Sequence, residues 1–107
     1  MGAARANAWD VLGEPRRREI LRLVWTTDRA AGEIAARMPV SFGAVSQHLR
    51  VLRDAGFVTV TKQGKQRIYR AKTEALGPFR AALEAMWARG LSRLARLAEE
   101  EERRGES

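Results

Sequence analysis

The sequence predicts a mainly α-helical domain with one small β-hairpin, in the order α-α-α-α-β-β-α. Apolar residues recur at helical spacing through most of the chain, which favours amphipathic helices. Residues 57–71 are instead rich in Val, Thr, Ile and Tyr and are interrupted by Gln63-Gly64-Lys65, a hairpin signal. Because 107 residues suit one hydrophobic core, we expect a single domain over 1–107, with 99–107 as a frayed acidic tail.

A glycine and a proline separate the first two helices. Residues 4–12 predict a short helix that Gly13 ends. Pro15 suits the first position of a second helix, which we expect to run to about residue 26. The apolar sides of the two helices consist of Ala8, Trp9 and Leu12, and of Ile20, Leu21, Leu23 and Val24.

A tight turn joins the next two helices. The third helix spans about 31–38 and ends because Pro39 cannot continue it. Ser41 is a good N-cap for a fourth helix over 42–54, and Gly56 suits the left-handed conformation that closes a helix. Three apolar residues at i, i+4 and i+7 turn one side of the fourth helix toward the core: Val45, Leu49 and Leu52.

Two strands and a long helix complete the chain. We expect strands over 57–62 and 66–71, then a last helix that begins near Thr73 or Pro78 and runs to about Glu102. Two short helices joined by a tight turn form a helix-turn-helix, and a strand pair directly after it makes a winged helix-turn-helix. The apolar stripe of the last helix comprises Leu76, Phe79, Leu83, Met86, Trp87, Leu91, Leu94 and Leu97.

The charge of the chain is strongly positive and unevenly distributed. Twenty basic and thirteen acidic residues give a net charge of +7, with a pI of about 11.2. Residues 41–72 carry seven basic residues against one acid, whereas residues 99–107 carry five acids and two arginines. A domain this basic is expected to bind a polyanion, and the acidic tail is expected to be solvated.

Several classes of function are excluded by what the sequence lacks. The absence of cysteine excludes disulfides, thiol nucleophiles and zinc–thiolate sites. His48 is the single histidine, and we expect it to pack or to hydrogen-bond locally rather than to bind metal. No nucleophile elbow or phosphate-binding glycine loop is present, so we expect no enzyme activity, no metal and no cofactor. Without an apolar run of about 20 residues, a cytoplasmic protein with no membrane partner is expected.

The outward side of the fourth helix and the hairpin predict a surface for double-stranded DNA. Gln47 can make the bidentate pair with adenine, and Arg50 can reach a guanine edge or a phosphate. Small residues in the first turn permit a close approach to a groove. The candidate contacts on the helix are Ser41, Phe42, Gly43, Ser46, Gln47, Arg50 and Arg53. Those on the hairpin, for phosphates or the minor groove, are Lys62, Gln63, Lys65 and Arg67.

The apolar stripe of the last helix exceeds what one small core needs. We therefore predict that a second copy of the chain covers it, with Trp9 and Leu12 of the first helix at the same interface. A two-fold dimer would place two recognition helices about 34 Å apart, which suits a palindromic operator. The predicted interface comprises Trp9, Leu12, Phe79, Leu83, Met86, Trp87, Leu91 and Leu94.

The sequence resembles the ArsR/SmtB family of bacterial transcriptional regulators. The resemblance covers roughly residues 5–98, and it is carried by Leu12–Leu21, Gly32–Ala35, Val40–Val58, Gly64 and Tyr69. It implies a homodimeric winged helix-turn-helix that pairs through its first and last helices, and a repressor released by a ligand or a covalent change. Metal-sensing branches carry cysteine pairs near the third helix, or His and Asp on the last. This chain is similar to the cysteine-free, non-metal-sensing branch.

We interpret the sequence as that of a sequence-specific DNA-binding transcriptional regulator, a homodimeric repressor with an effector that the sequence does not specify. Two alternatives stay open. One is a nucleoid-type protein that coats DNA with little sequence preference, and the other is a winged helix that binds proteins. Ser46 and Gln47 on the reading side favour the regulator over the nucleoid-type protein.

Overall fold

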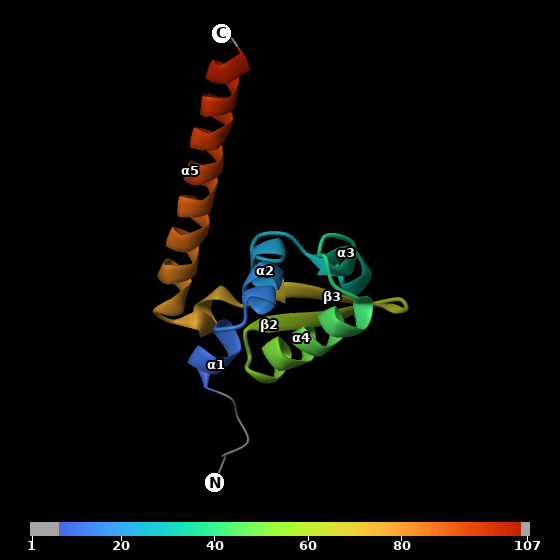
Figure 1. Cartoon of the computed structure of the whole chain (residues 1–107). Coiled ribbons are helices and arrows are strands. Elements are labelled where there is room, and N and C mark those ends of the chain that lie inside the picture. The colour runs from blue at the N-terminus through green and yellow to red at the C-terminus, as the bar shows by residue number, and fades with distance from the viewer. Residues whose placement is uncertain (1–6, 106–107) are drawn as a thin grey trace. The chain divides into compact units, whose positions relative to one another are not determined.

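The computed structural model describes residues 7–105, in two compact units with their boundary between Gly77 and Pro78. The first unit contains short helices, a small sheet and a 3-10 turn, and the second is one long helix (Figure 1). In chain order the elements are α1 (Ala8–Leu12), α2 (Pro15–Leu23), β1 (Arg29–Ala30), α3 (Ala31–Ala36), α4 (Phe42–Asp54), β2 (Val58–Gln63), β3 (Gln66–Ala71), η1 (Thr73–Leu76) and α5 (Phe79–Gly105).

Most predicted elements are present, with shifted ends. The helix predicted over 42–54 and the strand predicted over 66–71 have those bounds in α4 and β3. α1 begins at Ala8 because the Asn7 side chain accepts a hydrogen bond from the Asp10 amide at 2.9 Å. Residues 4–6 of the predicted first helix lie outside the described residues. α2 and α3 end earlier than predicted, and residues 99–105, predicted as a frayed tail, are helical.

The predicted hairpin is part of a three-stranded antiparallel sheet. β2 and β3 pair over their full length, and β1 pairs with the other edge of β3, which gives the order β1-β3-β2. The sequence analysis missed β1 because two residues are too few to show an alternating pattern.

The core of the first unit surrounds α4, which packs against α2, α3 and β2. The three α4 residues predicted to face inward, Val45, Leu49 and Leu52, are at most 1 % exposed. Gly56 ends the helix with a φ of +81°, the left-handed conformation predicted for it. The outward side of α4 is therefore fixed by the burial of the opposite side.

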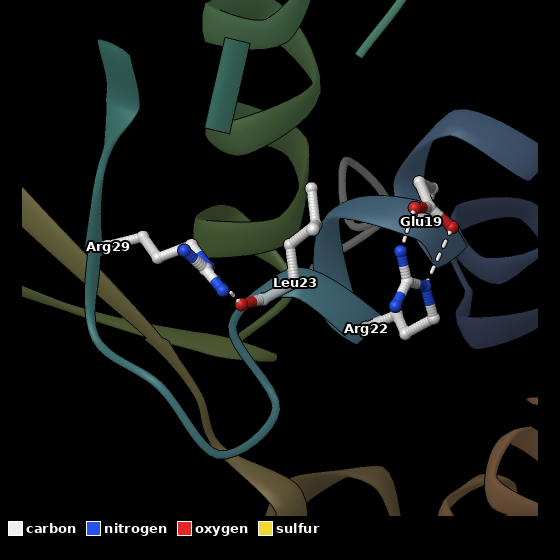
Figure 2. A network of polar contacts seen from close by, with 4 residues as sticks. All are labelled: Glu19, Arg22, Leu23 and Arg29. Atoms are coloured by element: carbon white, nitrogen blue, oxygen red, sulfur yellow. Dashed lines mark hydrogen bonds and ion pairs between the residues drawn. The ribbon is translucent and has the colours of Figure 1, made fainter. Parts of the chain in front are cut away.

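Arginine side chains hold the ends of the first two helices. Arg17 Nε donates to the carbonyl of Val11 at 2.8 Å, and Arg18 Nη1 donates to that of Leu12 at 2.9 Å. These carbonyls lie in the last turn of α1, where no intrahelical donor remains. Figure 2 shows the equivalent contact for α2, in which Arg29 Nε donates to the carbonyl of Leu23 at 2.7 Å, beside the exposed Glu19–Arg22 ion pair.

Arg17 also connects α1 and α2 to α4. Its Nη1 lies 3.4 Å from Nδ1 of His48, and its Nη2 donates to the carbonyl of Asp10 at 3.2 Å. Because a guanidinium has only donors, Nδ1 accepts and the imidazole proton is assigned to Nε2. Burial and the charge of Arg17 lower the pKa of His48, and Glu14 opposes that shift. His48 is therefore neutral at pH 7.

From the lowered pKa of His48 we expect the folded protein to lose stability in mild acid. The pKa of His48 in the folded chain lies below its unfolded value of about 6.5, so the unfolded chain binds the proton more readily. The contribution of His48 to the free energy of unfolding is present above pH 6.5 and is lost as the pH falls. Denaturant unfolding at pH 7 and pH 5 should therefore show a larger loss for the wild type than for His48→Asn. An equal loss in both proteins would contradict the assignment.

Candidate nucleic-acid interface

α4 presents a continuous polar side to solvent. The Ser41 hydroxyl caps the helix by accepting from the Ala44 amide at 3.1 Å. Phe42 is 56 % exposed, and a Cβ at Gly43 would meet no atom closer than 3.9 Å, so the first turn leaves room for a close partner. The structure places all seven predicted α4 contacts at the exposed surface: Ser41, Phe42, Gly43, Ser46, Gln47, Arg50 and Arg53.

The β2–β3 hairpin, which we call the wing, carries the four predicted wing contacts on its exposed end. Gly64 turns the chain with a φ of +60°. Lys62 lies directly opposite Arg67 in the register, and Gln63 lies opposite Gln66. Like charges directly opposite one another destabilise a strand pair, so the pairing of Lys62 with Arg67 lowers the stability of this tip.

Two recesses lie between α4, the wing and the start of α3. The larger has a volume of about 330 Å³ and is lined by Phe42, Lys65 and Gly32 among others. The smaller, about 80 Å³, is lined by Arg50 and Arg53 of α4 and by Leu49. Three residues line both recesses: Ser46, Arg67 and Tyr69.

The sequence analysis missed part of this surface. Tyr69, which is 7 % exposed, and the start of α3 at Ala31 and Gly32 were not among the candidate contacts. The alternation of β3 carried a signal for Tyr69, because it shares a sheet face with Arg67. Pairing of β1 with β3 brings α3 to the wing, and no local pattern revealed that pairing.

Some cations of the basic stretch have partners inside the fold. Arg70 Nη1 forms an ion pair with Asp28 at 2.8 Å, and Arg53 Nε lies 3.8 Å from a carboxylate oxygen of the neighbouring Asp54. Within residues 7–105, the guanidinium groups of Arg50 and Arg67 make no hydrogen bond or ion pair. The positive charge available to a partner is therefore concentrated at α4 and the end of the wing.

The residues predicted for a dimer interface differ in exposure. Leu12, in the first unit, is 6 % exposed, which leaves little of its surface for a partner. Phe79, Met86 and Trp87 are half-buried. Large exposed fractions remain on Trp9, Leu91 and Leu94, at 75 %, 70 % and 64 %.

Other kinds of site receive no support in the described part of the chain. Between residues 7 and 105, no three His, Asp or Glu side chains gather as a metal site would require. Over the same residues, no helix has both the length and the apolar character needed to cross a bilayer.

Comparison with known proteins identifies the family to which the chain belongs. The model of bacterial regulatory proteins of the arsR family matches residues 14–60. The HTH-type transcriptional regulator Rv2034 of Mycobacterium tuberculosis is 37 % identical over 95 residues, which cover 89 % of each chain. The transcriptional repressor SdpR of Bacillus subtilis is 31 % identical over 70 residues, covering 65 % of this chain and 78 % of SdpR.

The solved structures that resemble this fold include a possible regulator of the same family. A homodimeric winged helix-turn-helix DNA-binding domain from Mycobacterium bovis, a possible ArsR-family regulator, superposes with a TM-score of 0.64. The two chains are 25 % identical, and the match covers 74 % of this chain and 73 % of that one. The family resemblance and the fold predicted from the sequence are confirmed. The chain belongs to the ArsR family of bacterial regulators, and it is a DNA-binding winged helix-turn-helix protein of transcription rather than an enzyme.

Proposed function

We propose that this protein is a homodimeric repressor that binds a palindromic operator in double-stranded DNA. The observation that carries the proposal is the exposed polar side of α4, which lies across two recesses from the basic wing. A helix that buries Val45, Leu49 and Leu52 must present its opposite side to any groove that it enters. The whole chain then acts as one cytoplasmic DNA-binding domain, without cofactor or metal.

Sequence reading is assigned to the exposed polar groups of α4. The side-chain amide of Gln47 can form a bidentate pair of hydrogen bonds with adenine, and the guanidinium of Arg50 can form one with guanine. Ser41 and Ser46 suit phosphate oxygens near the start of the helix. The wing, with Lys62, Lys65 and Arg67 among its residues, supplies contacts that depend little on base sequence.

Dimerisation is assigned to α5. Leu91, Leu94 and Leu97 are 58 to 70 % exposed in the single chain and recur every three residues, so they form an apolar stripe along one side of the helix. A second copy of the same stripe would cover it. The homodimeric relative from Mycobacterium bovis supports the formation of a dimer, and the repressor SdpR supports repression as the outcome of binding.

Substitution of Gln47 tests the reading helix. Gln47→Ala should weaken binding to the preferred site by about 1–3 kcal/mol and relax the preference at one base pair. Lys65→Ala is the matched control, since loss of a phosphate contact should weaken selected and scrambled duplexes alike. Fluorescence anisotropy at one salt concentration, on a site selected from a random library, measures both. Equal affinity of the wild type for both duplexes would instead favour a nucleoid-type protein.

Charge placed on the α5 stripe tests the dimer. Leu91→Glu should give a monomer, because a carboxylate buried in an apolar interface carries a penalty of several kcal/mol. Ser92→Glu adds the same charge to the neighbouring exposed position and should stay dimeric. Sedimentation velocity at micromolar concentration distinguishes the two states. A dimeric Leu91→Glu protein would show that the stripe is not the interface.

A further inference from the structure

Phe42 is an exposed apolar side chain that the proposed dimer does not cover. Among the described residues, the large apolar side chains that are more than half exposed are Trp9, Phe42, Leu91, Leu94 and Leu97. The predicted interface contains Trp9, and the proposed α5 stripe contains the three leucines. Phe42 is 56 % exposed and is the first residue of α4. Single exposed apolar residues are common on proteins, so the meaning of this one depends on its surroundings.

The surroundings of Phe42 are polar and basic. Its side chain lines the larger recess, which Lys65 and Arg67 of the wing also line. Ser46, one turn further along the same side of α4, borders this recess too. Among the described residues that line it, none is acidic. A partner that fits this setting therefore carries negative charges around an apolar group.

Phe42 occupies the end of α4 that reads bases in a helix-turn-helix. The N-terminal residues of such a reading helix contact base edges. Side chains of a helix lean toward its N-terminus, so Phe42 projects from the start of the first turn. Gly43 follows it, and a Cβ there would meet no atom closer than the Ser41 hydroxyl oxygen at 3.9 Å. The neighbouring residues thus leave the ring accessible to a base pair.

The major groove of DNA offers one kind of apolar group to such a ring. All four bases present hydrogen-bond donors or acceptors there, and thymine adds a C5 methyl. Phe42 is the large apolar residue among the seven outward candidates of α4, since the others are polar, charged or glycine. Gln47 lies about 140° around the helix and about 7.5 Å along it from Phe42, so the two side chains address different base pairs.

We propose that Phe42 is a specificity-determining residue that packs against the C5 methyl of one thymine in each half-site. This inference rests on the proposed operator-binding function and names one base that the reading helix selects. It also implies a response to DNA methylation, because 5-methylcytosine carries its methyl at the same place in the major groove. Cytosine at this position should therefore be bound more tightly when it is methylated.

Replacement of thymine by deoxyuridine tests the contact, because it removes the methyl and retains the base pair. A scan of the selected site with the wild type should find one position per half-site where affinity falls about fourfold, as expected for one buried methyl. Replacement in both half-sites should lower affinity about sixteenfold if the two contacts are independent. Phe42→Ala should bind the thymine duplex more weakly and lose this position-specific penalty. A penalty equal to that of the wild type would overturn the proposal.

Two controls separate the methyl contact from other effects of the substitution. Phe42→Leu keeps an apolar side chain and should retain sensitivity to uracil at the same position. Phe42→Ala should leave the thermal midpoint unchanged or higher, because Phe42 is exposed and alanine is the better helix former. If Phe42→Ala weakens binding, but the wild type has no uracil-sensitive position, the ring has another contact and the proposal is wrong.

A methylated duplex tests the same contact in the opposite direction. At the uracil-sensitive position, a cytosine–guanine pair replaces the thymine–adenine pair, with and without a C5 methyl on the cytosine. The wild type should bind the methylated duplex about fourfold more tightly than the unmethylated one. Phe42→Ala should bind the two alike. Equal binding of both duplexes by the wild type would contradict the methyl contact.

The outcomes distinguish this inference from the proposed function. If selected and scrambled duplexes bind equally, the sequence-specific function fails. The methyl contact still stands if uracil in place of every thymine of the scrambled duplex weakens binding by the wild type but not by Phe42→Ala. If the sequence preference is normal, but no uracil-sensitive position depends on Phe42, the function stands and the methyl contact fails.

Discussion

The first unit depends on arginine side chains that complete the ends of helices too short to stand alone. α1 has five residues and α2 has nine, and isolated helices of this length are not stable in water. Their last carbonyls receive donors from Arg17, Arg18 and Arg29, which lie on the next element of the chain. Arg17 also lies 3.4 Å from His48, so one side chain connects α1 and α2 to α4. The surface proposed to contact DNA is thus joined to the rest of the unit by an arginine that does not lie on it.

Local signals made α4 the most predictable part of the fold. Ser41 and Gly56 mark where α4 begins and where the chain leaves it, and the spacing of Val45, Leu49 and Leu52 identifies its buried side. The ends of other elements depend on long-range bonds. α2 stops at Leu23, after which the Val24 carbonyl accepts from the Ala71 amide at 2.9 Å. No pattern within residues 15–26 contains that information.

The candidate site divides in the same way. Residues on α4 and the wing could be predicted because side chains repeat about every 3.6 residues in a helix and every 2 in a strand. This repeat alone determines which side of each element faces solvent. The contribution of α3 to the site could not be predicted from the sequence. α3 reaches the wing because β1, directly before it, pairs with β3, about forty residues further along the chain. Counting charges also overstated the DNA-facing surface. Arg70 is held by Asp28, and the arginines that complete helix ends serve the fold. A sequence count cannot distinguish a guanidinium that donates to a carbonyl from one that faces solvent.

The pairing of Lys62 with Arg67 makes the order of the wing tip depend on its surroundings. In the free protein, repulsion between these cations opposes the two-residue turn that joins their strands. A polyanion that lies against both removes the repulsion and tightens the turn. Dissolved ions also weaken the repulsion between Lys62 and Arg67, because the screening length is about 8 Å at physiological ionic strength. Concentrated salt therefore favours an ordered wing tip in the free protein, but it also weakens the attraction of the tip to DNA. As the ionic strength rises, the rigidity of the tip increases and its affinity for DNA decreases.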